Sequence, residues 1–262
     1  MPLLTYVICT APRTGSTLLT EGLEATGQAG RPAEYFAILP KNARHWVSRL
    51  GIRNDVEYVD KVIEAATGPN GVCGLKLHWH QTSVFQAKLA SALNAGNRDG
   101  SGATLADLVQ ARFGEVLHLW LRRHNKVAQG ISYYRASRTG QWFSFEERRE
   151  RKKKPPDFDF CAIDRMVGLC VDFDRQWESY FRRHRIGPLV LVYEEFVNAY
   201  AATIRAVLQF LGLPGIDAVP APRLEQQADE TSREWERRYR AISAARRADD
   251  AVVKNHQARH SR

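Results

Sequence analysis

The chain has 262 residues, of which 44% are hydrophobic and 10% aromatic, so it can bury a large core, and we expect a single domain over residues 1–262. The formal charge of +9 suits an anionic ligand, a nucleic acid or a membrane surface, and composition alone does not choose among these partners. No apolar run approaches about 20 residues, which excludes a transmembrane helix from the expected elements. No basic segment followed by a long apolar core opens the sequence, so no signal peptide is expected. The four cysteines form no C-x-x-C pair and predict reduced thiols in a cytoplasmic protein.

The first predicted elements are a strand, a small-residue loop and a helix, in that order. Apolar residues over 3–9 predict a strand buried on both faces, as in a parallel sheet. Pro12 and Gly15 then interrupt the strand, and apolar side chains from Leu18 onward recur at helical spacing. A helix that begins directly after such a loop has unpaired backbone N–H groups and the positive end of its dipole there. This stretch therefore predicts a site for a phosphate or a sulfate.

Arg13, and not a lysine, supplies the positive charge of this loop. A Walker A loop carries Lys directly after its second Gly, whereas Ser16 follows Gly15 here. This departure disfavours an ordinary P-loop kinase. The planar guanidinium of Arg13 can hold two anionic oxygens at once. The alternative interpretation of the loop is a surface turn without a ligand.

The later apolar runs predict three further strands with helices between them. The predicted strands cover residues 72–77, 116–121 and 189–193. Helical patterns cover residues 40–68, 84–93, a segment that opens near Asn125, 162–184 and 194–211. The aromatic stripe of the 162–184 helix indicates either core or a subunit interface. Residues 94–102 are expected to form a flexible, Gly-rich loop, and the charged residues 144–160 a mobile, solvent-facing insertion that contains the basic run 148–154.

Polar side chains follow the strands at their carboxyl ends. Arg122 and Arg123 end the 116–121 strand. In open α/β sheets ligands bind at the carboxyl ends of the strands, so we expect this end to join the first loop in one cleft. His78 and His80 alternate onto one face after the 72–77 strand, but no third ligand is near in sequence, so no metal site is predicted.

Five segments of the chain together resemble a known family. In chain order they are APRTGSTLL, GRPAEYF, LRRHNKVAQGISYYRA, VYEEFVNAYAATIRAVLQFLGLP and LEQQADETSREWERRYR. In their order and spacing they resemble the bacterial trehalose 2-sulfotransferase family over nearly the whole chain. The resemblance implies an α/β, P-loop nucleotide-kinase-like three-layer fold with a central, mainly parallel sheet. It also implies a homodimeric enzyme that sulfates a carbohydrate hydroxyl with 3′-phosphoadenosine 5′-phosphosulfate (PAPS) and needs no metal.

The same resemblance implies which residues bind PAPS. The 5′-phosphosulfate loop would comprise Arg13, Thr14, Gly15, Ser16 and Thr17. Negative charge moves onto the leaving 5′-phosphate oxygen during sulfuryl transfer, so donors fixed around that oxygen stabilise the transition state more than the ground state. Arg13 therefore has an expected catalytic role as well as a binding role. Arg123 and Ser132 match the family's 3′-phosphate pair, and their alternatives are a solvated arginine and a helix-face hydroxyl.

Glu34 falls on the position of the general base in that family. An attacking hydroxyl loses its proton as its bond to sulfur forms, and a carboxylate beside it can take that proton. Burial would raise the pKa of Glu34, and neighbouring Arg13 or Arg31 would lower it. The alternative interpretation is a carboxylate that merely pairs with one of these arginines.

Three residues are expected on the acceptor side. Trp79 can stack on a sugar face, and Lys76 can neutralise the sulfuryl oxygens; strand-end packing and a surface ammonium are the alternatives. Arg31 stands where the trehalose enzyme carries an acidic residue, so trehalose, a glycolipid and other oligosaccharides stay candidate acceptors. No role is assigned to Gln227, Asp229 or Trp235, which also fit the family pattern.

Two other function classes stay open at this point. One is a P-loop kinase-like phosphotransferase, which would need Mg²⁺ for transfer from ATP. The other is a basic protein that binds nucleic acid or a membrane surface through residues 148–154, with an affinity that falls steeply with salt. We expect neither a nucleic-acid partner nor a membrane-spanning segment.

Overall fold

A computed structural model describes residues 1–38, 40–93, 102–140, 142, 156–222 and 229–260. Most of the Gly-rich loop 94–102 and of the charged insertion 144–160, with the whole basic run 148–154, lies outside these described residues. The chain divides into two compact units, each built from two segments: residues 1–124 with 172–223, and residues 125–171 with 224–262. The single-domain organisation stays a prediction.

The first unit is built on a parallel four-stranded sheet of order β2-β1-β3-β4. The strands are β1 (Leu4–Thr10), β2 (Val72–His78), β3 (Val116–Arg122) and β4 (Leu189–Val192). Thr10 of β1 lies opposite both His78 and Leu121, and Arg122 lies opposite Val192. The carboxyl ends of all four strands therefore meet at one edge. The α/β class and the parallel sheet are confirmed.

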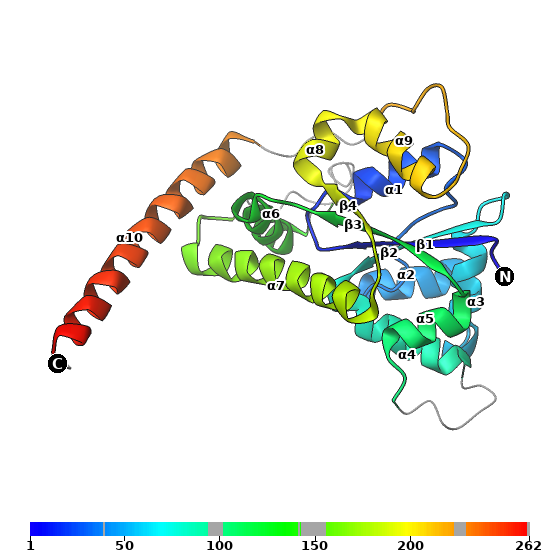
Figure 1. The fold of residues 1–262 in the computed structure, drawn as a ribbon, viewed down its shortest axis with the longest axis horizontal. Helices are drawn as coiled ribbons and strands as arrows, with labels where there is room; N and C mark the ends of the chain where they lie inside the picture. The colour runs from blue at the N-terminus through cyan, green and yellow to red at the C-terminus, as the bar shows by residue number, and fades with distance from the viewer. Residues whose placement is uncertain (39, 94–101, 141, 143–155, 223–228, 261–262) are drawn as a thin grey trace. The chain divides into compact units, whose positions relative to one another are not determined.

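Helices cover both faces of this sheet (Figure 1). They are α1 (Ser16–Ala25), α2 (Pro40–Leu50), α3 (Asp55–Ala66), η1 (Trp79–Gln81), α4 (Thr82–Leu93), α5 (Leu105–Phe113), α8 (Tyr193–Asn198), α9 (Tyr200–Phe210) and the second half of α7 (Phe160–His184). Successive strand side chains point to opposite faces, so β1 contributes to two cores. Val7 and Cys9 pack in one apolar cluster, and Tyr6 and Ile8 pack in the other.

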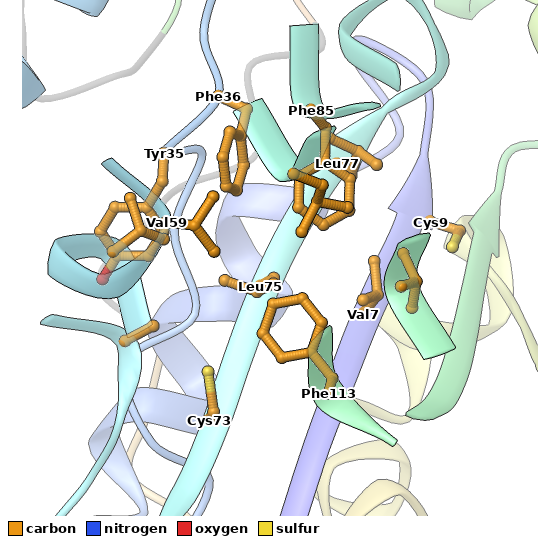
Figure 2. Close-up of a cluster of buried hydrophobic side chains, with 14 of the residues drawn as sticks. Val7, Cys9, Tyr35, Phe36, Val59, Cys73, Leu75, Leu77, Phe85 and Phe113 are labelled. Atoms are coloured by element: carbon orange, nitrogen blue, oxygen red, sulfur yellow. The ribbon is translucent and has the colours of Figure 1, made fainter. Parts of the chain in front are cut away.

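The cluster around Val7 and Cys9 is the larger core. Figure 2 shows strand side chains such as Leu75 and Leu77 facing aromatic side chains such as Phe36 and Phe85. The cluster on the opposite face joins β1 and β3 to α1 and α9. A helix layer on each face of a parallel sheet gives the expected three-layer arrangement.

The second unit is helical. It contains α6 (Lys126–Thr139), the first half of α7 and α10 (Glu230–His260), packed around Ile131, Tyr134, Ile163, Trp235 and Tyr239. A Cβ atom at Gly130 would lie 2.5 Å from Val167 Cγ2, so α6 and α7 approach this closely only because residue 130 is Gly.

The aromatic stripe of α7 serves the interior of the chain. Its first part packs in the core of the second unit, and Trp177, Tyr180 and Phe181 pack in the core of the first. Core packing, one of the two expected alternatives, therefore accounts for the stripe. Among the described residues, no helix has both the length and the apolar character needed to cross a membrane.

Candidate active site

The loop between β1 and α1 has two residues with left-handed backbone conformation. Arg13 has a φ of 66° and Gly15 a φ of 80°. A side chain in this region is strained, and such strain is concentrated at ligand-binding and active sites. The Thr14 hydroxyl turns inward, 2.6 Å from Thr10 Oγ1, and donates to Ala11 O at 3.0 Å. Thr14 can therefore contribute to an anion site through its backbone N–H.

Ser16 and Thr17 lie in the first turn of α1, which begins directly after Gly15. Ser16 is buried and Thr17 is half-buried. Both backbone N–H groups belong to the helix N-terminus, where donors lack intrahelical partners. This local geometry is that of the predicted anion site.

Side chains from the ends of β3 and β4 hold the loop. Arg123 Nη1 donates to Arg13 O at 3.2 Å, and its guanidinium carbon lies 4.5 Å from the centre of the Tyr193 ring. A Cβ atom at Gly15 would lie 2.6 Å from Tyr193 Cδ2. Residue 15 therefore must be Gly both for its conformation and for the space beside Tyr193. Trp177 of α7 also fixes the end of β1, because its indole N–H donates to Thr10 O at 2.8 Å.

Glu34 reaches the same edge of the sheet through a short pairing with β2. Ala33 pairs in parallel with Leu75, and the Lys76 N–H donates to Ala33 O at 3.1 Å. The Trp46 indole N–H donates to the Glu34 carbonyl at 2.9 Å. These contacts fix the backbone on both sides of Glu34 and direct its side chain toward the carboxyl end of β2.

Three side chains hold the Glu34 carboxylate. Oε2 lies 3.4 Å from Lys76 Nζ and 3.1 Å from His78 Nε2, and Oε1 accepts a 2.6 Å hydrogen bond from Gln81 Nε2. The side chains of Lys76 and His78 are only 5% and 8% exposed, whereas that of Glu34 is 27% exposed. Gln81 is itself oriented by the His78 N–H, which donates to its Oε1 at 3.0 Å. The carboxylate is therefore held on its buried side by these three side chains, and its other side is open to solvent.

Burial on its own would raise the pKa of Glu34. The charges of His78 and Lys76 and the hydrogen bonds from His78 and Gln81 outweigh burial and place this pKa well below its usual range. Glu34 is therefore ionised at neutral pH. Arg31, one of the partners expected for Glu34, instead donates to Ala65 O and Thr67 O at the end of α3.

The other predicted site residues lie in different settings. Trp79 packs edge-on against Trp177, with 4.9 Å between ring centres, which favours the packing alternative for its ring. Ser132 lies half-buried on α6 in the second unit, and Arg123 lies in the first unit. Their pairing on one phosphate stays a prediction. The described residues contain no cluster of three or more His, Cys, Asp or Glu suited to a metal ion.

Sequence reasoning missed three residues that support the site: Trp46, Gln81 and Tyr193. Gln81 had a local signal, because a side chain three residues after the last strand residue can return to its backbone N–H. Tyr193 directly follows the last strand, at the edge where ligands are expected. Trp46 has no such signal, because its contact with Glu34 depends on how α2 packs.

The model for the Stf0 sulphotransferase family matches residues 5–242. The chain belongs to this family. It is 30% identical over 260 residues to the trehalose 2-sulfotransferase of Mycobacterium tuberculosis (strain Erdman), and 28% identical over 259 residues to that of Mycolicibacterium smegmatis. Each match covers 90% of this chain and 94% of the relative. A crystal structure of a sulfotransferase from Alicyclobacillus acidocaldarius is 18% identical, with a TM-score of 0.48 over 94% of each chain. The protein is thus a sulfotransferase, and its family supports sulfuryl transfer over the phosphotransferase and the nucleic-acid or membrane-binding alternatives.

Proposed function

We propose that this sulfotransferase transfers the sulfuryl group of PAPS to a carbohydrate hydroxyl, in line, with Glu34 as the general base. The observation that carries the proposal is the Glu34 carboxylate, held by Lys76, His78 and Gln81 at the same sheet edge as the phosphate-type loop. Family membership over residues 5–242 supports the reaction class.

PAPS would be held mainly by hydrogen bonds from backbone N–H groups and guanidinium groups. The 5′-phosphosulfate is assigned to Arg13, Thr14, Gly15, Ser16 and Thr17. The 3′-phosphate is assigned to Arg123 and Ser132. Arg13 acts on the reacting group, because its positive guanidinium stabilises the negative charge that accumulates on the leaving 5′-phosphate oxygen. The contact of Arg123 with the Arg13 carbonyl supports a common role for these residues.

Residues of the chain are assigned to the proton transfer and to the charge changes of sulfuryl transfer. The acceptor oxygen forms a bond to sulfur while the bond between sulfur and the 5′-phosphate oxygen breaks, which releases adenosine 3′,5′-bisphosphate. Glu34 takes the hydroxyl proton. Lys76 then loses its counter-charge, because the protonated Glu34 is neutral, and its ammonium offsets the charge of the sulfuryl oxygens instead. Protein cations carry the charge in this scheme, so it uses no metal.

The acceptor is assigned by resemblance. Two relatives that are named trehalose 2-sulfotransferases support a sugar, with trehalose as the first candidate and glycolipids or oligosaccharides as the others. Arg31 and Lys76 are assigned to the acceptor side, and Trp79, which is half-buried and packs edge-on against Trp177, stays a candidate there. A homodimer completes the proposal on the family resemblance alone, and a cytoplasmic location rests on the four cysteines, which form no C-x-x-C pair.

The test combines donor binding with transfer to a panel of acceptors. Calorimetry with PAPS and with ATP at equal concentration should detect binding of PAPS only. Labelled PAPS is then incubated with trehalose, other disaccharides, oligosaccharides and glycolipids, and sulfated product is measured by mass spectrometry. Binding of neither nucleotide, or Mg²⁺-dependent transfer from ATP, would refute the proposal.

A further inference from the structure

In the second unit, α10 contacts one side of α6 both before and after Ser132. Asn125, the N-cap of α6, precedes Ser132 by two helical turns, and Arg135 follows it by one, so the three residues lie along the same side of the helix. Side chains of α10 and of the residue before it contact Asn125 and Arg135. The helix that carries the proposed 3′-phosphate hydroxyl is therefore held on both sides of Ser132.

The contact after Ser132 is a bidentate ion pair between Arg135 and Asp229. Arg135 Nη1 donates to Asp229 Oδ1 at 2.6 Å, and Nη2 donates to Oδ2 at 2.7 Å. The guanidinium carbon also lies 5.9 Å from the centre of the buried Trp235 ring. The hydrogen bond from Arg135 lowers the pKa of Asp229 well below its usual range, so the pair is ionised at neutral pH. A single exposed ion contact contributes little, whereas two parallel hydrogen bonds fix the direction of both side chains.

Asp229 also joins this ion pair to the backbone of α10. It directly precedes α10, and its Oδ1 accepts the Ser232 N–H at 2.9 Å, as an N-cap does. Arg135 donates to the Ser232 hydroxyl as well. One carboxylate thus caps α10 and holds α6, which fixes the start of α10 to the helical turn after Ser132.

The contact before Ser132 lies at the start of α6. Asn125 Oδ1 caps α6 by accepting the Ala128 N–H at 3.0 Å, while its Nδ2 donates to Glu236 Oε1 of α10 at 2.9 Å. Arg240 Nη2 reaches the same two side chains, 3.1 Å from Asn125 Oδ1 and 2.7 Å from Glu236 Oε1. Two consecutive turns of α10 therefore hold the N-cap of α6.

We propose that α10 positions Ser132 for the 3′-phosphate, and that Asp229 is the positioning residue that acts on it through Arg135. A hydroxyl that meets one phosphate oxygen loses that hydrogen bond when its helix shifts by about 1 Å. The inference rests on the proposed function, because the role of Ser132 is part of it. It gives Asp229 a role in donor selection, which favours PAPS over adenosine 5′-phosphosulfate, a nucleotide without the 3′-phosphate.

The test is the affinity of Asp229→Asn for PAPS and for adenosine 5′-phosphosulfate, measured by calorimetry. Asparagine keeps an N-cap oxygen but loses the charge and one of the two acceptors for Arg135. We expect PAPS to bind about 3- to 10-fold more weakly, as for one lost hydrogen bond, and adenosine 5′-phosphosulfate to bind within about twofold of the wild type. Asp229→Glu, which restores the carboxylate, should regain most of the PAPS affinity.

Glu230→Gln is the matched control. It removes one negative charge from the adjacent residue, and among the described residues the Glu230 side chain pairs with Arg233 and Arg237 of its own helix. A change in net charge alone would alter PAPS binding alike in both variants. A loss through Ser132 should appear only in Asp229→Asn.

Combination with Ser132→Ala shows whether Asp229 acts through Ser132. If it does, the double variant should bind PAPS as Ser132→Ala does, because the hydroxyl is already absent. Additive losses would overturn the proposal. Equal losses for the two nucleotides in Asp229→Asn would also overturn it, because they indicate a general loss of structure.

The outcomes separate this inference from the proposed function. A wild-type protein that does not bind PAPS refutes the function itself. Wild-type affinities in Asp229→Asn, together with weaker PAPS binding by Ser132→Ala, overturn only the role of Asp229. If Asp229→Asn does not fold, Arg135→Lys is measured in the same way, because lysine keeps the charge but lacks the planar pair of donors. An unchanged ratio of the two affinities in Arg135→Lys would then overturn the proposal.

Discussion

Glu34 is the residue on which both the charge balance and the proposed chemistry depend. In Glu34→Gln the amide keeps the shape of the side chain but cannot take a proton. We expect transfer to slow by about 10²- to 10⁴-fold while PAPS affinity is retained. Glu24→Gln, on the exposed face of α1, is the matched control and should keep wild-type turnover. Single-turnover assays with calorimetry of PAPS binding measure both quantities, and full turnover in Glu34→Gln would contradict the assignment.

The same residue also links stability to pH. The folded-state pKa of Glu34 is depressed, so the ion cluster contributes stability above the unfolded-state pKa of about 4.3, and this contribution is lost as pH falls toward the folded-state value. At neutral pH, Glu34→Gln should lower the free energy of unfolding by about 1–3 kcal/mol, because buried Lys76 loses its counter-charge. The difference from the wild type should shrink below about pH 4.

Adding Lys76→Met to Glu34→Gln tests this cause of instability. Removal of the unpaired ammonium should recover part of the lost free energy of unfolding. Urea unfolding of the wild type, both single variants and the double variant gives the coupling. Additive effects would mean that the ion pair does not stabilise the fold.

At the scale of elements, the loop before α1 depends on Tyr193 of α8 as much as on its own sequence. Gly15→Ala adds a Cβ at a φ of 80° and 2.6 Å from the Tyr193 ring. Gly27→Ala is the matched control, because its φ is 70° and no atom lies within 4 Å of the added Cβ. Both should lose about 1–2 kcal/mol of stability through backbone strain. Only Gly15→Ala should also weaken PAPS binding; equal binding by the two variants would show that Tyr193 does not shape the site.

Two predicted helical regions are each interrupted within a few residues, so their boundaries differ from the prediction. The predicted 194–211 helix is interrupted at Ala199, and the 40–68 region forms two helices separated by Gly51, whose φ is 63°. The sequence did not predict α5 or the 31-residue α10. On α10 the described buried side chains are Trp235 and Tyr239, too few to give a clear apolar period.

At the scale of the molecule, the 3′-phosphate proposal depends on Arg123 and Ser132. We expect Arg123→Ala to lower PAPS affinity about 10- to 100-fold, as for a lost hydrogen bond to a charged group, and to lower affinity for adenosine 5′-phosphosulfate much less. Ser132→Ala should act in the same direction with a smaller effect. Calorimetry with both nucleotides measures the ratio. An unchanged ratio in both variants would remove the 3′-phosphate assignment.

The sequence by itself determined the parallel α/β class, the loop before α1 and the family, because these depend on apolar runs, on breaks of a few residues and on segment order. It also placed Glu34 as a candidate base. Only the tertiary structure decided what surrounds that carboxylate. His78 and Gln81 lie 44 and 47 positions further along the chain and reach Glu34 through strand pairing. The contact of Trp79 with the Trp177 ring of α7 likewise joins residues far apart in the chain. Such contacts depend on register and packing across the sheet, which no local pattern encodes.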